Sequence, residues 1–154
     1  MKKLDPIDLE ILAELYGDSR ITNKELAAKV KIAPSTCLER VKRLHVSGVI
    51  KSFCLELDLK AVGCNIEAMT AVRLGKQSSE IFEQFRASLL ASAEVIRIYH
   101  MGGENDFLLH IAVKDTQHLR DFIFREITSR KEVVHIETAL IYEQATSGSL
   151  PIFN

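Results

Sequence analysis

The sequence comprises 154 residues, 47% of them hydrophobic and 27% charged, which fits one or two small folded domains and argues against a large multidomain enzyme. No apolar run approaches the roughly 18 residues of a membrane span, and the start Met1–Pro6 lacks a signal core, so we expect a cytoplasmic protein without a membrane partner. The cysteines at 37, 54 and 64 are too scattered for a disulfide framework or a metal site.

The net charge of −1 conceals an uneven distribution. Residues 1–60 carry a net charge of +2 and residues 61–154 carry −3, while the segment 24–51 holds seven basic and two acidic residues. A basic segment on a near-neutral chain is typical of a DNA-reading element attached to a second domain. We therefore predict a DNA-binding domain over 1–57, a linker over 58–65 and a second domain over 66–154.

Three helices are expected in the first domain. Asp5-Pro6 can begin the first helix, and Thr22 with Glu25 forms a capping box for a short second one. Pro34 suits the first turn of a third helix over about 34–47. Two helices joined by a tight turn over about 22–47 indicate a helix-turn-helix motif.

The third helix has one apolar stripe and one polar face. The second helix of such a motif enters the major groove with its N-terminal end, where hydroxyls and guanidinium groups can reach bases or phosphates. The residues expected to contact double-stranded DNA are Ser35, Thr36, Glu39, Arg40, Lys42 and Arg43. The alternative is a three-helix packing unit whose charged face is merely solvated.

Residues Ser52–Leu57 alternate like a short strand after the third helix. Lys51, at its start, could contact the DNA backbone as a small wing. The alternative is an ordinary hairpin edge.

The second half alternates between strand and helix patterns. Strands are expected over 66–74, 95–101, 106–113 and 133–142, with helices beginning near Ser78 and Thr116. The order β-α-β-β-α-β predicts a ferredoxin-like domain, and hence an α+β protein. Neither face of the strands is consistently charged, so we expect the sheet to pack against a second copy in an obligate dimer.

The sequence resembles one family along most of its length, the Lrp/AsnC or feast/famine transcription regulators of prokaryotes. The similar stretches are Leu4–Leu12, Arg20–Leu26, Cys37–Leu44, Gly48–Ile50 and Gly103–Leu109, together with Thr138. The resemblance implies a helix-turn-helix domain followed by an amino-acid-sensing domain, in dimers that commonly form octamers, on the nucleoid. It also implies an effector site at a Gly-x-x-Asp turn, which corresponds here to Met101, Gly102, Gly103, Glu104, Asn105, Asp106 and Thr138.

Two positions depart from the family pattern. Ala33 stands where the family usually has a serine that caps the third helix, and Arg130-Lys131-Glu132 replaces a usual Pro-Gly. The chemistry of the turn itself suits an amino acid, because Gly102-Gly103 can aim backbone N–H groups at a carboxylate and Asp106 or Glu104 can accept from an ammonium group. The alternative is a tight hairpin in which Asp106 bonds its own turn.

Two other functions remain open from the sequence. His100 and His110 on neighbouring strands could serve an enzyme, but no nucleophile, phosphate-binding or cofactor motif accompanies them, so we expect no enzyme and no cofactor. An architectural protein that binds DNA with little sequence preference could use the same charges.

Overall fold

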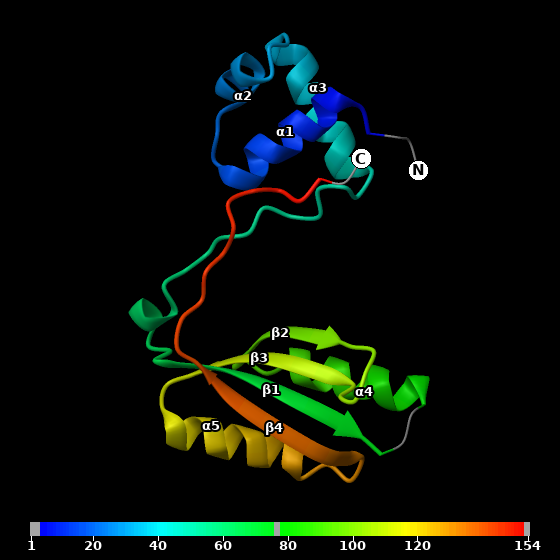
Figure 1. The fold of residues 1–154 in the computed structure, drawn as a ribbon, viewed down its shortest axis with the longest axis vertical. Helices are drawn as coiled ribbons and strands as arrows, with labels where there is room; N and C mark the ends of the chain where they lie inside the picture. The colour runs from blue at the N-terminus through cyan, green and yellow to red at the C-terminus, as the bar shows by residue number, and fades with distance from the viewer. Residues whose placement is uncertain (1–3, 76–77, 153–154) are drawn as a thin grey trace. The chain divides into compact units, whose positions relative to one another are not determined.

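The computed structural model describes residues 4–75 and 78–152, which divide into two units (Figure 1). Residues 4–56 and 145–152 form the first unit, and residues 57–144, apart from the two undescribed positions, form the second. This division differs from the predicted one, because the segment after residue 144 groups with the helices. The carbonyl oxygen of Gly148 lies 3.9 Å from where a Cβ on Gly17 would stand.

The first unit holds the three predicted helices, α1 (Pro6–Gly17), α2 (Asn23–Lys29) and α3 (Pro34–Val46). The capping boxes of α1 and α2 form from Asp5 with Asp8 and from Thr22 with Glu25. One apolar cluster joins the helices, and its buried members are Ile11, Leu26, Ala27, Val30, Cys37, Leu44 and Ile50.

The strand expected over residues 52–57 is absent from the structure. The backbone there is extended without strand pairing to any described residue, and Phe53, Leu55 and Leu57 remain 53%, 80% and 54% exposed. Apolar alternation predicts which side chains share a side, but a strand also needs a neighbour, and none of the described residues supplies one here. A 3₁₀ turn at Leu59–Val62 follows, within the predicted linker.

The second unit has the expected order, β1 (Ile66–Leu74), α4 (Ser79–Leu90), β2 (Val95–His100), β3 (Phe107–Val113), α5 (Thr116–Ile123) and β4 (Val133–Ile141). The sheet order is β2-β3-β1-β4, and every neighbouring pair is antiparallel. A π-helical turn, Phe124–Thr128, extends α5. No helix in the described ranges is long and apolar enough to cross a membrane.

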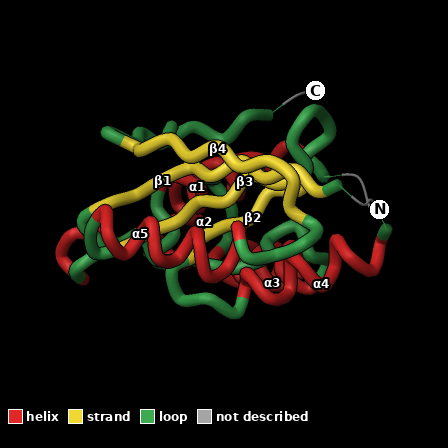
Figure 2. The backbone as a smooth tube through the Cα atoms, turned by 90° about the horizontal axis from the view of Figure 1, so that it is seen from below, coloured by secondary structure: helices red, strands yellow, loops and turns green. Residues whose placement is uncertain are grey.

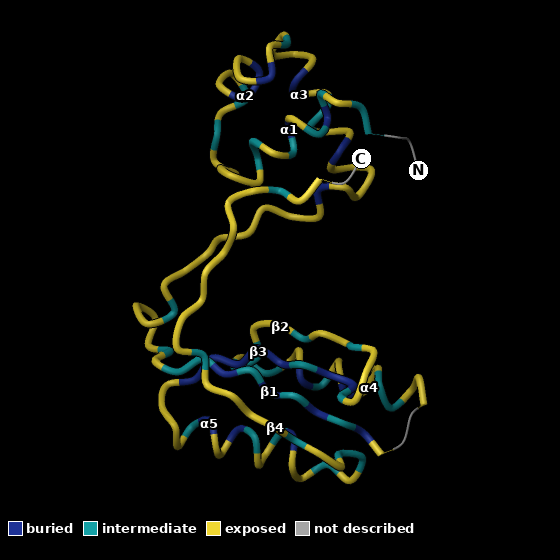
Figure 3. The backbone as a smooth tube through the Cα atoms, viewed as in Figure 1, coloured by how far each residue is buried: buried dark blue, intermediate teal, exposed yellow. Residues whose placement is uncertain are grey.

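Both helices of the second unit cover one face of the sheet (Figure 2). Phe85 and Leu89 of α4 and Phe122 of α5 pack against alternate residues of the strands, and all three are almost completely buried. The central strands β1 and β3 carry most of the burial, whereas β4 is mainly exposed (Figure 3). No described helix of this unit covers the opposite face of the sheet.

Candidate functional site

The backbone conformation of Lys31 and the packing of the core define the turn between α2 and α3. Lys31 adopts a left-handed conformation with φ of 55°, which reverses the chain within a few residues. Cys37 and Leu44 anchor α3 at 0% and 1% exposure, and burial raises the pKa of the Cys37 thiol. The second helix of the motif is thereby fixed against the first.

The outward face of α3 presents four of the six residues expected there to contact DNA. Ser35 and Thr36 are exposed in its first turn, and Glu39 and Lys42 are exposed further along. Small hydroxyl side chains at the leading end permit close approach of the helix to base edges. This surface has the shape and chemistry of a recognition helix.

Arg40 and Arg43 do not extend freely from this face, contrary to the expectation from the helical wheel. Arg40 Nη1 lies 2.6 Å from Asp5 Oδ2 and 2.8 Å from Asp8 Oδ1. Arg43 Nη2 lies 2.8 Å from both carboxylate oxygens of Asp8. The Arg40 side chain is only 20% exposed, whereas that of Arg43 is 47% exposed, so Arg40 is the more deeply engaged with α1.

The ion pairs change the electrostatics of the first turn of α1. The hydrogen bond from Arg40 and the one from the Asp8 backbone hold the pKa of Asp5 below its usual value. The same contacts with Asp5 and Asp8 raise the pKa of Arg40, which is therefore charged at all physiological pH values. Part of the positive charge predicted to face DNA is thus balanced inside the unit.

Lys51 follows the buried Ile50 and is exposed in the extended segment. No hairpin wing built from the described residues supports it within one chain. Its role as a backbone contact stays a prediction.

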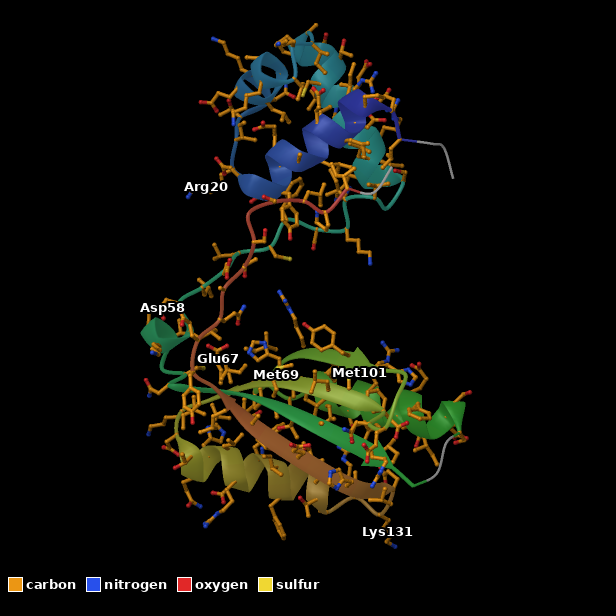
Figure 4. The ribbon with its side chains drawn as sticks, viewed as in Figure 1. Arg20, Asp58, Glu67, Met69, Met101 and Lys131 are labelled. Carbon is orange, nitrogen blue, oxygen red and sulfur yellow. The ribbon has the colours of Figure 1, made fainter. Side chains whose placement is uncertain are left out.

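The turn between β2 and β3 is braced by Asp106. Its Oδ2 accepts a hydrogen bond from the Leu74 N–H of β1 at 2.7 Å, and its backbone links to Met101 and Val72. Figure 4 labels Met101, where the turn leaves β2. Asp106 is 8% exposed, and its carboxylate bonds a neighbouring strand instead of its own turn. The part it would take in binding an effector stays a prediction.

The other residues of the turn are more open. Gly103 has φ of 146°, and a Cβ at Gly102 or Gly103 would meet nothing within 4 Å, which leaves the backbone approachable. Glu104, 80% exposed at its side chain, pairs with Arg73 at 3.1 Å. The buried Asn105 Oδ1 has no hydrogen-bond partner among the described residues.

Thr138 lies apart from this turn. Its Oγ1 is 3.0 Å from that of Thr70, and it lines a shallow groove of about 450 Å³ between α5 and β4. The groove is formed by Thr116, Leu119, Arg120, Ile123, Phe124, Thr128, Thr138 and Leu140. Within one chain, the turn 101–106 and Thr138 therefore form two separate surfaces.

The two histidines considered for catalysis point to opposite faces of the sheet. His100 stacks on Phe82 and Phe107, with ring centroids 4.9 and 5.0 Å apart, on the helix-covered side. His110 Nε2 lies 2.8 Å from Glu67 Oε2 on the open face. The structure does not bring them together, and the described residues contain no cluster of three His, Cys, Asp or Glu residues that could hold a metal ion.

Comparison with known families divides the chain into a helical part and a sheet part. A model described as winged helix-turn-helix DNA-binding matches residues 4–51, and a model described as the Lrp/AsnC ligand binding domain matches residues 67–150. The chain belongs to the Lrp/AsnC family. It is thus a DNA-binding transcription regulator with a ligand-binding domain.

Relatives and solved structures of this family agree along nearly the full length. The HTH-type transcriptional regulator AldR of Mycolicibacterium smegmatis is 38% identical, over 96% of this chain and 86% of its own length. The leucine-responsive regulatory protein of Rhizobium meliloti is 36% identical, over 92% and 91%. A transcriptional regulator of Neisseria meningitidis, solved as a complex with L-Met, superposes with a TM-score of 0.87 at 28% identity, over 97% of both chains.

Sequence reasoning missed the acidic partners of the α3 arginines. The sequence pattern indicates Asp5 and Asp8 only as the start of α1, although they lie against Arg40 and Arg43. The pairs join residues 32 to 35 positions apart, and no local pattern in a single sequence reports such a contact. In this Lrp/AsnC protein, ion pairs connect the recognition helix α3 to α1.

Proposed function

We propose that the protein is a sequence-specific transcription regulator whose assembly or DNA affinity is changed by a small effector, most simply an amino acid. The observation that carries the DNA part is the exposed row Ser35, Thr36, Glu39 and Lys42 on a rigidly anchored α3. Two such helices in a dimer read half-sites about one helical turn, ~34 Å, apart. Arg43, half exposed, supplies a phosphate contact when the motif docks.

The effector proposal is supported by the turn between β2 and β3. Asn105 Oδ1 is a buried acceptor without a partner among the described residues, and such an atom costs stability unless a ligand or second copy supplies a donor. Backbone N–H groups around Gly102 and Gly103 suit the carboxylate of an amino acid. A relative complexed with L-Met is consistent with this ligand class.

Dimerisation through the open face of the sheet is supported by the side chains on that face. Figure 4 shows Glu67 and Met69 on the side of the sheet opposite α5. By strand register, the face holds Glu67, Met69, Ala71, Arg97, Tyr99, Leu108, His110, Ala112, Glu137, Ala139 and Ile141. Apolar groups in its middle favour a second copy over water, while octamers are a further expectation from the family.

The proposed activity needs neither an enzyme site nor a cofactor. Since the proposed target is chromosomal DNA, we place the activity in the cytoplasm, on the nucleoid.

The test is binding of the full chain to DNA from upstream of its own gene, followed by fluorescence anisotropy with a nonspecific competitor. Each of the twenty amino acids is added in turn. If binding resists the competitor and one amino acid changes the DNA affinity, both parts of the proposal are supported. If binding resists the competitor but no amino acid changes the affinity, the effector part of the proposal is excluded. Absence of binding contradicts the whole proposal.

A salt titration separates this proposal from an architectural protein. Phosphate contacts weaken steeply with salt for any sequence, whereas base contacts preserve a preference of ~1–3 kcal/mol each. Loss of all preference at every salt concentration would favour the architectural alternative.

The effector site has a matched pair of variants. Asn105→Ala removes the unpartnered acceptor and is expected to abolish the amino-acid shift while leaving DNA binding intact. Asn65→Ala makes the same exchange at an exposed asparagine before β1, whose amide bonds the Lys114 carbonyl, and is expected to leave the shift in place. An unchanged shift in Asn105→Ala would contradict this assignment.

A further inference from the structure

The carboxylate of Asp8 has an unusual position for a residue of a first helical turn. It is 3% exposed, and it accepts from the Asp5 backbone N–H, from Arg40 and from Arg43. A buried carboxylate is tolerated only when it is paired and hydrogen-bonded. Both of its cationic partners come from α3.

Apart from the ion pairs with Asp8 and Asp5, few polar contacts orient α3 against the other helices. Its N-cap Ala33 makes no side-chain hydrogen bond, and its first turn is tied to α2 by one bond, from Asn23 Nδ2 to the Pro34 carbonyl at 2.9 Å. The small Cys37 and the aliphatic Leu44 supply its most deeply buried contacts. Apolar packing is non-directional, whereas the hydrogen bonds to Asp8 have a fixed geometry.

The residues that face DNA are coupled to these arginines by helix geometry. Thr36 lies four residues before Arg40, and Glu39 lies four residues before Arg43, so each pair shares one side of α3. A rotation of α3 that breaks the bonds to Asp8 therefore displaces Thr36 and Glu39 as well. Base readout depends on positions held to a fraction of an ångström.

We propose that Asp8 is a positioning residue for DNA recognition, which fixes the rotation of α3 through Arg40 and Arg43 without contacting DNA. Arg40 then belongs to the support of the recognition helix and not to its DNA-contacting surface. The inference rests on the proposed sequence-specific binding.

The test compares Asp8→Asn with Glu10→Gln in the full chain. Both variants remove one negative charge from α1, but Glu10 is exposed and makes none of the ion pairs of this cluster. Binding to upstream DNA and to nonspecific DNA is measured over a range of salt concentrations. We expect Asp8→Asn to reduce the ratio of specific to nonspecific affinity about tenfold or more, and Glu10→Gln to leave it unchanged.

A second variant, Arg40→Gln, keeps the test decisive where Asp8→Asn fails to fold. If Arg40 neutralised a phosphate, removing its charge would lower the salt slope of DNA binding by about 0.9. A positioning role predicts an unchanged slope with a reduced specificity ratio.

Three outcomes count against the inference. It is overturned if Asp8→Asn matches Glu10→Gln, or if Arg40→Gln lowers the salt slope and keeps the specificity ratio. A wild-type chain without specific binding overturns the proposed function as well.

Discussion

The Asp106 carboxylate accepts the Leu74 N–H at 2.7 Å, just beyond Val72 and Phe107, the last residues paired between β1 and β3. Where the pairing of two strands ends, a backbone donor that faces the missing neighbour has no ladder partner, and a nearby side chain must satisfy it. The sequence identified the turn and its glycines but not this contact. The point at which β1 and β3 stop pairing depends on the register of strands distant in sequence, so one sequence does not reveal which donor is left free.

Removing the Asp106 carboxylate is therefore expected to weaken the second unit. Asp106→Ala should lower the free energy of unfolding by about 1–3 kcal/mol, since the buried Leu74 N–H loses its acceptor. Urea unfolding measures the change. Asp121→Ala, which removes an exposed carboxylate from α5, should stay within about 0.5 kcal/mol of wild type, and equal effects of the two variants would contradict the assignment.

The lowered pKa of Asp5 predicts how the stability of the first unit changes in acid. Hydrogen bonds from Arg40 and from the Asp8 backbone lower its pKa in the folded state, so folding favours the ionised carboxyl. The resulting stability is complete above the unfolded-state pKa of about 3.9 and is lost as the pH falls through the lower folded-state pKa. We expect Asp5→Asn to be less stable than wild type at pH 7 and the difference to shrink between about pH 5 and pH 2, as followed by thermal unfolding.

At the scale of elements, local signals account for most of the secondary structure. Asp5, Thr22, Pro34 and Ser78 stand at helix starts, because capping groups and prolines act on their own backbone neighbours. The segment 52–57 shows the limit of such signals. Its apolar residues do alternate, yet a strand is defined by a pairing partner, and none of the residues that the structure describes provides one.

The uncapped start of α3 offers a stabilising change. Ala33 has φ of −67° and ψ of 142°, a conformation from which a serine hydroxyl can accept the free N–H of Thr36. Ala33→Ser should raise the free energy of unfolding by about 0.5–2 kcal/mol, measured by thermal or urea unfolding. Ala28→Ser makes the same exchange inside α2, where serine is a weaker helix former, and a gain there of equal size would exclude capping as the cause.

At the scale of the whole molecule, the proposed dimer depends on the open face of the sheet. The alternation of the strands predicted a face without consistent charge, and the structure places Met69, Ala71 and Leu108 on it beside the Glu67–His110 pair. The sequence alone could therefore suggest a partner for this face. The arrangement of charged and apolar groups across three strands required their register.

Ala71 lies near the middle of that face, opposite Leu108 on β3 and Glu137 on β4. Ala71→Lys should dissociate the proposed dimer, because the interface would have to take up a long side chain in place of a methyl group and to desolvate its ammonium group, a cost that the neighbouring Glu137 offsets only in part. Sedimentation velocity at low micromolar concentration would then show a monomer. Ala87→Lys, on the exposed side of α4, should leave the dimer intact; a dimer that persists in Ala71→Lys would exclude this face.

The grouping of residues 145–152 with the helices bears on how the protein is made. During synthesis, α1, α2 and α3 leave the ribosome first, and the entire sheet unit follows before this segment emerges. The DNA-binding unit therefore gains its full set of contacts only after the ligand-binding unit has been translated.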